Sequence, residues 1–227
     1  MVSDLLIFDM DGVLVDVSDS YREAIRATVR HFTGRDISKG DIQDYKNQGG
    51  WNDDWSLSHH LIGQAGVEVD FQSVVDHFQS IFHGHNGHEA LILRERWIAG
   101  EGLFERLIER FQLAVFTGRL RWEANLTLNR FAPHLAFAPV VGADDVQRLK
   151  PHPDGLLKIL AEAAKQKAWY VGDTVDDARS AQAAGLPFIG IASPQNPRHD
   201  AVVEVLNGAG AVAVLDDINQ LETVLGS

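Results

Sequence analysis

Apolar and polar residues alternate along the chain in blocks that predict a layered structure of strands and helices. Short apolar runs, typical of buried strands, are each followed by a stretch with apolar residues at helical spacing. Strands that alternate with helices form a parallel sheet covered on both faces, so the predicted fold class is α/β with a doubly wound parallel sheet. The predicted strands are Leu5–Phe8, 112–116, 136–141, 169–171, 188–191 and 211–214, and the helices between and after them are 103–111, 122–131, 156–160, 176–184 and 217–225.

One interval breaks this alternation. About a hundred residues separate the first strand from the second, although a strand–helix–strand crossover needs only about a dozen. Apolar residues at helical spacing between Phe71 and Phe82 indicate that the interval is helical. We therefore expect two domains, an α/β core formed by residues 1–16 and 93–227 and an inserted helical cap domain formed by residues 17–92.

The first helix of the insert is predicted over residues 19–33. Ser20 and Glu23 have the spacing of a capping box, in which each side chain accepts a hydrogen bond from the other residue's backbone N–H. This pair supports the predicted start of the helix.

Composition and charge narrow the class of protein. The 227 residues contain 45% hydrophobic and 23% charged residues, which is ordinary for a globular protein of one or two domains. No apolar stretch approaches the roughly 20 residues of a membrane span, and the N-terminus lacks the features of a signal peptide, so we expect a cytoplasmic protein with no membrane partner. The net charge of −12, without a Lys/Arg-rich block, argues against nucleic-acid binding. An anionic substrate would need a local cation.

Two carboxylates mark the end of the first strand. Asp9 ends it and Asp11 lies two residues on, so an extended backbone would point both side chains to one side. Asp9 could attack phosphorus and form an aspartyl-phosphate, while Asp11 could protonate the leaving oxygen and then activate water. Gly12 permits a close turn beside a substrate. Taken alone, the same residues fit a strand followed by an acidic turn equally well.

Hydroxyl and cationic groups follow later in the chain. Thr117 and Gly118 come directly after the second core strand, where a hydroxyl and a backbone N–H could bind phosphoryl oxygens, although Thr-Gly is also common in turns. Arg119 could bind a substrate carboxylate or a second anion. Lys150 could offset the charge of Asp9, a phosphate and a metal site.

A third acidic segment follows the strand at 169–171. Asp173 offers the hard carboxylate oxygens that suit Mg²⁺, and Asp177 could act directly or through water. Asp176 and Asp177 could instead stabilise the N-terminus of the next helix, and the two interpretations are compatible. Because the carboxyl ends of parallel strands meet in one crevice, we expect these segments to converge.

Together, in this order, four segments resemble the motif set of the haloacid dehalogenase superfamily. The chain is similar to its phosphoglycolate phosphatase-like group, in which a helical cap follows the first motif. The resemblance is specific for the core and loose for the cap. The segments are Asp9-Met10-Asp11-Gly12-Val13-Leu14, Thr117-Gly118-Arg119, Lys150-Pro151 and Gly172-Asp173-Thr174-Val175-Asp176-Asp177.

The resemblance implies a role for each acidic residue. Asp9 would be the nucleophile and Asp11 the general acid and base. Mg²⁺ would be bound by the Asp9 carboxylate, the Asp11 backbone carbonyl and Asp173. Asp177 would support the metal and the lysine of the third motif. Superfamily members that dehalogenate 2-haloacids lack an acid at the position of Asp11 and need no metal, so this residue favours phosphate chemistry.

The resemblance also implies an activity. Thr117, Gly118 and Lys150 would hold the phosphoryl group of a small phosphorylated metabolite. The resemblance does not identify that metabolite, and phosphoglycolate and histidinol phosphate are examples to test. The predicted function is a Mg²⁺-dependent phosphomonoester hydrolase, monomeric or homodimeric. A phosphosugar mutase of the same superfamily is the nearest alternative, and a non-catalytic phosphate-binding or regulatory protein is the other. A doubly wound sheet also resembles response-regulator receivers, but the inserted cap and the Asp9/Asp11 pair of this chain argue against that class.

Two segments of the insert carry further candidate chemistry. In the Gly-rich segment at 47–55, Trp51 and Asn52 could contact the organic part of a substrate, but the tryptophan could equally pack inside the cap. A His-rich turn could bind a transition metal, but its spacing matches no established zinc site and a polar loop is the preferred interpretation. Its histidines are His83, His85 and His88.

Overall fold

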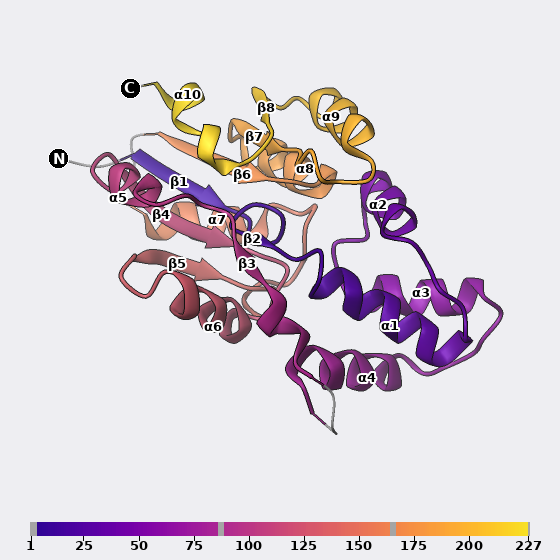
Figure 1. The fold of residues 1–227 in the computed structure, drawn as a ribbon. Helices are drawn as coiled ribbons and strands as arrows, with labels where there is room; N and C mark the ends of the chain where they lie inside the picture. The colour runs from indigo at the N-terminus through magenta and orange to yellow at the C-terminus, as the bar shows by residue number, and fades with distance from the viewer. Residues whose placement is uncertain (1–3, 86–88, 164–166, 227) are drawn as a thin grey trace. The chain divides into compact units, whose positions relative to one another are not determined.

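A six-stranded parallel sheet forms the centre of the computed structural model, which describes residues 4–85, 89–163 and 167–226. Its strand order is β5-β4-β1-β6-β7-β8, so the predicted α/β fold class is confirmed (Figure 1). The strands are β1 (Asp4–Phe8), β4 (Phe111–Phe116), β5 (Phe137–Val141), β6 (Ala168–Gly172), β7 (Phe188–Ile191) and β8 (Ala213–Leu215).

Strand β1 lies between β4 and β6 because its side chains are apolar on both faces. Phe8 pairs in register with Val115 of β4 and Val171 of β6. Side chains alternate along a strand, so Leu5 and Ile7 face one side of the sheet and Phe8 faces the other. The aromatic ring of Phe8 packs edge-on against Phe104 on that second side, with 5.7 Å between ring centroids.

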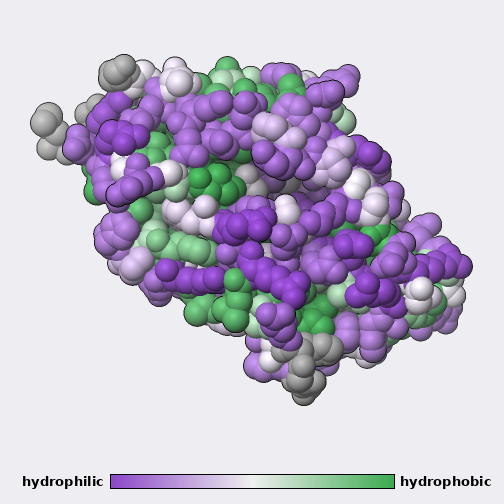
Figure 2. All heavy atoms as spheres, viewed as in Figure 1, coloured by the Kyte–Doolittle hydropathy of each residue, from purple (hydrophilic) through white to green (hydrophobic). Residues whose placement is uncertain are grey.

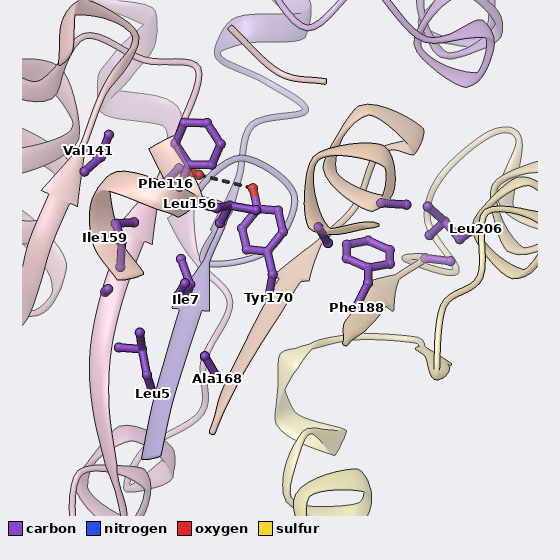
Figure 3. Close-up of a cluster of buried hydrophobic side chains, with 14 of the residues drawn as sticks. Leu5, Ile7, Phe116, Val141, Leu156, Ile159, Ala168, Tyr170, Phe188 and Leu206 are labelled. Carbon is purple, nitrogen blue, oxygen red and sulfur yellow. Dashed lines mark hydrogen bonds between the residues drawn. The ribbon is translucent and has the colours of Figure 1, made fainter. Parts of the chain in front are cut away.

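The first side of the sheet carries the main hydrophobic cluster (Figure 3). It joins residues of β1, β4 and β6 to apolar side chains of the helices that follow β5 and β6. Tyr170 stands in its centre and is fully buried. The helices of this part of the chain are α5 (Leu103–Leu107), α6 (Arg121–Phe131), α7 (Asp154–Glu162), α8 (Val175–Ala184), α9 (His199–Gly208) and α10 (Glu222–Leu225).

Residues Asp16–Arg96 form a second compact unit, which is helical. Helix α1 packs on both α3 and α4, and Val74, Phe78 and Phe82 bury the apolar face of α4. The short strands β2 (Val15–Asp16) and β3 (Arg96–Trp97) pair where the chain enters and leaves this unit. The helices are α1 (Tyr21–Thr33), α2 (Lys39–Gln48), α3 (Asp54–Gln64) and α4 (Phe71–His83).

The capping box predicted at Ser20 and Glu23 is wrong, although α1 begins at the next residue. Ser20 has φ −114° and ψ −90°, outside the extended conformation that lets an N-cap side chain reach back to the helix. Its backbone N–H instead bonds to the Val17 carbonyl, and the Glu23 carboxylate pairs with Arg26 at 2.7 Å. The buried Ser20 hydroxyl has no hydrogen-bond partner in the described residues.

Several predicted elements have different bounds in the structure. The helix expected over 103–111 ends at Leu107, because β4 already begins at Phe111. The helix expected over 217–225 is a 3₁₀ turn at Ile218–Gln220 followed by α10. The last strand lies at Ala213–Leu215 rather than 211–214.

The surface differs from the buried sheet in composition. Polar and charged side chains cover most of the face seen in Figure 2, with smaller apolar patches between them. In the described part of the chain, we find no helix with the length and apolar character needed to cross a membrane.

Candidate active site

Three neighbouring strands end at the candidate site. Asp9 follows β1, Thr117 follows β4 and Asp173 follows β6, each as the next residue after its strand. Since these strands are parallel and adjacent, their carboxyl ends lie at one edge of the sheet. The backbone N–H of Asp9 bonds to the Val171 carbonyl at 2.8 Å, which ties the end of β1 to that of β6.

A buried lysine joins two of the acidic motifs. The Lys150 ammonium lies 2.7 Å from Oδ1 of Asp9 and 2.7 Å from Oδ1 of Asp177. Exposed fractions are 1% for the Lys150 side chain, 6% for Asp9 and 0% for Asp177. Breaking such a pair would leave a charge without a partner in a dry environment, so the three groups fix one another's positions.

Two aromatic rings face the same ammonium. The Lys150 nitrogen lies 4.9 Å from the centroid of the Phe116 ring and 5.5 Å from that of Tyr170, within the range of cation–π attraction. The Tyr170 hydroxyl donates to Asp177 at 2.7 Å and lies 3.3 Å from the Phe116 carbonyl (Figure 3). A β-carbon at Gly155 would lie 2.1 Å from the Phe116 ring, so glycine there makes room for that ring.

Asp177 already accepts four donors. Its Oδ1 accepts from Lys150 and from the Tyr170 hydroxyl, and its Oδ2 accepts from the Thr174 backbone N–H at 3.0 Å and the Thr174 hydroxyl at 2.6 Å. The Thr174 hydroxyl also accepts from the Asp177 N–H, which completes a capping box at the start of α8. A carboxylate offers about four acceptor positions, so Asp177 is saturated by protein donors.

Burial and charge act in opposite directions on these groups. Burial raises the pKa of Asp9 to about 7; the Lys150 ammonium offsets part of this effect, while Asp177 and Asp11 add to it. Burial would lower the pKa of Lys150, but the carboxylates of Asp177 and Asp9 outweigh it and keep the amine protonated. Burial would raise the pKa of Asp177, but Lys150 and the hydrogen bonds hold it below its usual value.

Three carboxylates lie close enough to share a cation. One oxygen each from Asp9, Asp173 and Asp177 lies within 4.8 Å of the others. Hard carboxylate oxygens in this number suit Mg²⁺, which takes one or two carboxylates together with waters and phosphate. Gly12 (φ +78°) makes room for one of them, because a β-carbon there would lie 2.1 Å from Oδ2 of Asp173. The donor set therefore fits the predicted metal.

The side chain of Asp11 turns to a different partner. Its Oδ1 accepts from Nε of Arg119 at 2.9 Å and from Nη2 at 2.5 Å. The third guanidinium nitrogen donates to the Thr127 hydroxyl of α6 at 2.9 Å. A role of the Asp11 backbone carbonyl as a metal ligand stays a prediction.

Thr117 and Gly118 differ in exposure. Thr117 is 1% exposed, and its hydroxyl accepts the backbone N–H of Arg119 at 3.1 Å. Gly118 between them is exposed, as a backbone group that binds an anion must be. Their predicted role in holding a phosphoryl group stays a prediction.

Comparison with known proteins agrees with this arrangement. A family model described as haloacid dehalogenase-like hydrolase matches residues 6–191, which include all four motifs. The chain belongs to the haloacid dehalogenase-like hydrolase family. The resemblance inferred from the motifs is thereby confirmed.

Individual proteins also align over most of the chain. The imidazoleglycerol-phosphate dehydratase of Phytophthora nicotianae is 32% identical over 225 residues, covering 92% of this chain but only 49% of its own length. The chain thus spans about half of that relative. The pyrophosphatase PpaX of Anoxybacillus flavithermus is 25% identical over 82% of each chain. Phosphatase Tt82 of Thermococcus thioreducens has a similar structure, with a TM-score of 0.66, 25% identity, and coverage of 90% of this chain and 99% of its own.

Several residues of this candidate site could not be identified from the sequence. Thr174 had a visible signal, because it precedes Asp177 by three residues at a helix start, the spacing of a capping box. Tyr170 and Phe116 look like any aromatic residue of a buried strand. Thr127 lies in the middle of α6, and nothing in its neighbourhood marks it as a partner of Arg119.

The candidate residues of the helical unit are partly packed against one another. The Trp51 ring lies 4.4 Å from that of His60 and 5.7 Å from that of Tyr45, between ring centroids. The Asn52 carbonyl accepts from Lys46 at 3.3 Å. Trp51 and Asn52 both keep part of their surface exposed, so a substrate role stays a prediction.

The His-rich turn is only partly described. The rings of His83 and His85 lie 6.4 Å apart, and His88 lies outside the described residues. The interpretation of this turn as a polar loop stays a prediction.

Proposed function

We propose that this chain is a Mg²⁺-dependent phosphomonoester hydrolase that acts on a small phosphorylated metabolite through an aspartyl-phosphate at Asp9. The observation that carries the proposal is the convergence of Asp9, Lys150 and Asp173 at the carboxyl edge of the sheet. It supplies a nucleophile, a fixed cation and a metal ligand at one point. The names of the pyrophosphatase and phosphatase relatives support the same reaction class.

The metal would be held by Asp9 and Asp173 directly. Asp177 has no acceptor position left for it, so we assign this residue to holding Lys150 in place beside the metal. When bound, Mg²⁺ would polarise the phosphoryl oxygens and offset the negative charge of the site. It would also favour the ionised form of Asp9, whose pKa burial raises to about 7.

The reaction has two steps. In the first, a carboxylate oxygen of Asp9 forms a bond to phosphorus while the ester P–O bond breaks, and its electron pair leaves with the alcohol oxygen. That oxygen takes a proton from the Asp11 carboxyl group, so the alcohol departs neutral. Lys150, Thr117 and the Gly118 N–H would hold the phosphoryl oxygens during transfer.

The second step restores the enzyme. A water oxygen bonds to phosphorus and gives its proton to the Asp11 carboxylate. The P–O bond to Asp9 breaks, its electrons return to the Asp9 carboxylate, and phosphate leaves. Asp11 ends protonated and Asp9 ionised, as at the start.

We also propose the predicted division into a core formed by 1–16 and 93–227 and a cap formed by 17–92, with substrate selection by Trp51 and Asn52 in the cap. The compact unit found at Asp16–Arg96 supports this division. A cytoplasmic location and a monomeric or homodimeric state remain predictions.

Phosphate release tests the activity directly. The purified protein would be incubated with an aryl phosphate, phosphoglycolate, histidinol phosphate and imidazoleglycerol phosphate, with Mg²⁺ or with a chelator. We expect Mg²⁺-dependent release that falls at least about a thousandfold in Asp9→Asn, because this change removes the nucleophile. Chromatography of the products would separate hydrolysis from a mutase, which yields an isomeric phosphate ester instead.

Undiminished metal-dependent release by Asp9→Asn would overturn the mechanism. The matched control is Asp54→Asn in the helical unit, which also alters a carboxylate paired with a buried lysine. We expect this control to keep kcat within about threefold of the wild-type value.

A further inference from the structure

Arg119 makes an unusual set of contacts for an arginine beside a phosphate-binding turn. Its side chain is 1% exposed, and its Nε and Nη2 both donate to Oδ1 of Asp11. Nη1 donates to the Thr127 hydroxyl. The guanidinium therefore links the loop after β1 to helix α6, across 108 residues of sequence.

The contact restricts how Asp11 can move. A guanidinium is planar and rigid, so two of its N–H groups that converge on one carboxylate oxygen hold that oxygen in place and limit the movement of the side chain. The bond to Thr127 fixes the guanidinium in turn. Both of these bonds end on Oδ1 of Asp11, so within the described residues Oδ2 is the oxygen left to exchange a proton.

The same contact argues against the role that the sequence suggested for Arg119. The Arg119 side chain is only 1% exposed, so the guanidinium would have to move away from Asp11 to reach a substrate carboxylate. Separation would cost the ion pair and would leave a nearly buried guanidinium to find new acceptors.

We propose that Arg119, held by Thr127, is a positioning residue that fixes the Asp11 carboxyl group for both proton transfers. The inference rests on the proposed hydrolase function. It assigns Arg119 to the proton-transfer machinery and not to substrate recognition.

The two reaction steps give this role a distinct kinetic signature. An aryl phosphate has a good leaving group that departs with little protonation, so transfer of its phosphoryl group to Asp9 needs Asp11 least. An alkyl phosphate needs the proton in that step. Hydrolysis of the aspartyl-phosphate needs Asp11 as a base in both cases. Misplacing Asp11 therefore blocks alkyl esters at the first step and aryl esters at the second.

The experiment uses two variants and one control. Arg119→Lys keeps the charge but loses the forked donor geometry, and Thr127→Val removes only the hydroxyl that holds the guanidinium. The control is Arg121→Lys, because Arg121 lies in the same segment, is 52% exposed and pairs with Asp145 at 3.0 Å. Steady-state rates would be measured with an alkyl and an aryl phosphate, together with the rapid first-turnover burst of aryl alcohol.

For Arg119→Lys we expect kcat with the alkyl phosphate to fall about a hundredfold, within the usual range for general acid–base catalysis, and KM to stay within about threefold. With the aryl phosphate, the burst should grow relative to wild type and phosphorylated enzyme should accumulate. Thr127→Val should show the same pattern with about a fivefold loss, and Arg121→Lys should match wild type.

Other outcomes overturn the inference. A rise in KM for phosphoglycolate alone, with unchanged kcat, would show that Arg119 binds the substrate carboxylate. Equal losses on both esters without a larger burst would show a structural role only. If Arg119→Lys does not fold, Thr127→Val still decides between these outcomes. Wild-type turnover tests the hydrolase function separately, so its absence would be a failure of that proposal and not of the Arg119 assignment.

Discussion

Each of the two units contains a buried lysine, and the two lysines sit in opposite charge environments. In the α/β unit, one ammonium, that of Lys150, contacts two carboxylates, Asp9 and Asp177. In the helical unit, one carboxylate, that of Asp54, lies 2.5 Å from the Lys46 ammonium and 3.8 Å from the Arg22 guanidinium. The first cluster carries excess negative charge and the second excess positive charge.

The difference separates a cluster that can take a further cation from one that cannot. With Asp173 beside Asp9, the first cluster holds more negative charge than one lysine neutralises, and a divalent cation would balance it. Lys46 binds Asp54 and the Asn52 carbonyl, eight and six residues away, and so fixes a local loop. Lys150 joins residues 141 positions apart in the sequence and so helps to assemble the fold as well as the site.

Replacing each lysine by methionine would sharpen the contrast most. We expect Lys150→Met to abolish measurable turnover and to lower the free energy of unfolding by about 3–5 kcal/mol, because two buried carboxylates lose their cation. Lys46→Met should cost about 1.5–3 kcal/mol, the range for one charged hydrogen bond, and keep turnover when the protein is folded. Urea denaturation and phosphate release measure the two effects, and equal loss of turnover in both variants would break the comparison.

Magnesium binding should depend on pH through Asp9. Because its pKa in the folded protein is raised to about 7 from an ordinary value near 3.8, the metal-free fold gains stability from a protonated Asp9 at low pH and loses it as pH rises from about 4 to 7. Bound metal requires the ionised carboxylate. As the pH is raised toward 7, Mg²⁺ affinity should therefore increase about tenfold for each pH unit, and above pH 7 it should stay constant.

Calorimetric titration with Mg²⁺ at about pH 5.5, 6.5 and 8 measures how the affinity changes with pH, because the first two values lie below the Asp9 pKa and the third lies above it. In Asp9→Asn the dependence on pH should flatten, since the group that titrates is gone. The same affinity at the lowest and highest pH in the wild-type protein would contradict the prediction.

The smallest effect is expected in the helical unit. Trp51→Ala should lower kcat/KM for the best substrate by about five- to tenfold, the contribution of one aromatic contact, without altering Mg²⁺ affinity. Trp51→Phe keeps an aromatic ring beside His60 and Tyr45 and should lose less. If Trp51 only packs within its unit, thermal stability falls instead and kcat/KM stays unchanged.

The parts of the site that could be predicted from sequence are those that follow strands. Asp9, Thr117 and Asp173 each come directly after an apolar run, and the convergence of parallel strand ends brings them together. Lys150 has no strand before it, and only its place in the ordered motif set marked it. Its meeting with Asp9 depends on tertiary contacts across the sheet.

The site residues that could not be predicted from the sequence are those whose role depends on their neighbours in the folded structure. Tyr170 has the pattern of a core residue, and its hydroxyl gains a function only because Asp177 lies opposite it. The capping box predicted at Ser20 shows the opposite case, in which a sequence pattern is present but the structure does not form the contact. Its spacing to Glu23 fits a capping box, but the backbone entering α1 has the wrong dihedral angles, which no local pattern reveals.

Gly155 affects the interpretation of mutational scans of this protein, because it packs against a ring of the candidate site. The Phe116 ring occupies the space that any side chain at this position would need, and the Lys150 ammonium lies over that ring. Gly155→Ala would displace the ring that the ammonium faces and so disturb the site through Phe116 alone. A mutational screen that scores only activity would then group position 155 with the residues that take part in the reaction. A screen that also scores the abundance of folded protein would distinguish the two kinds of position.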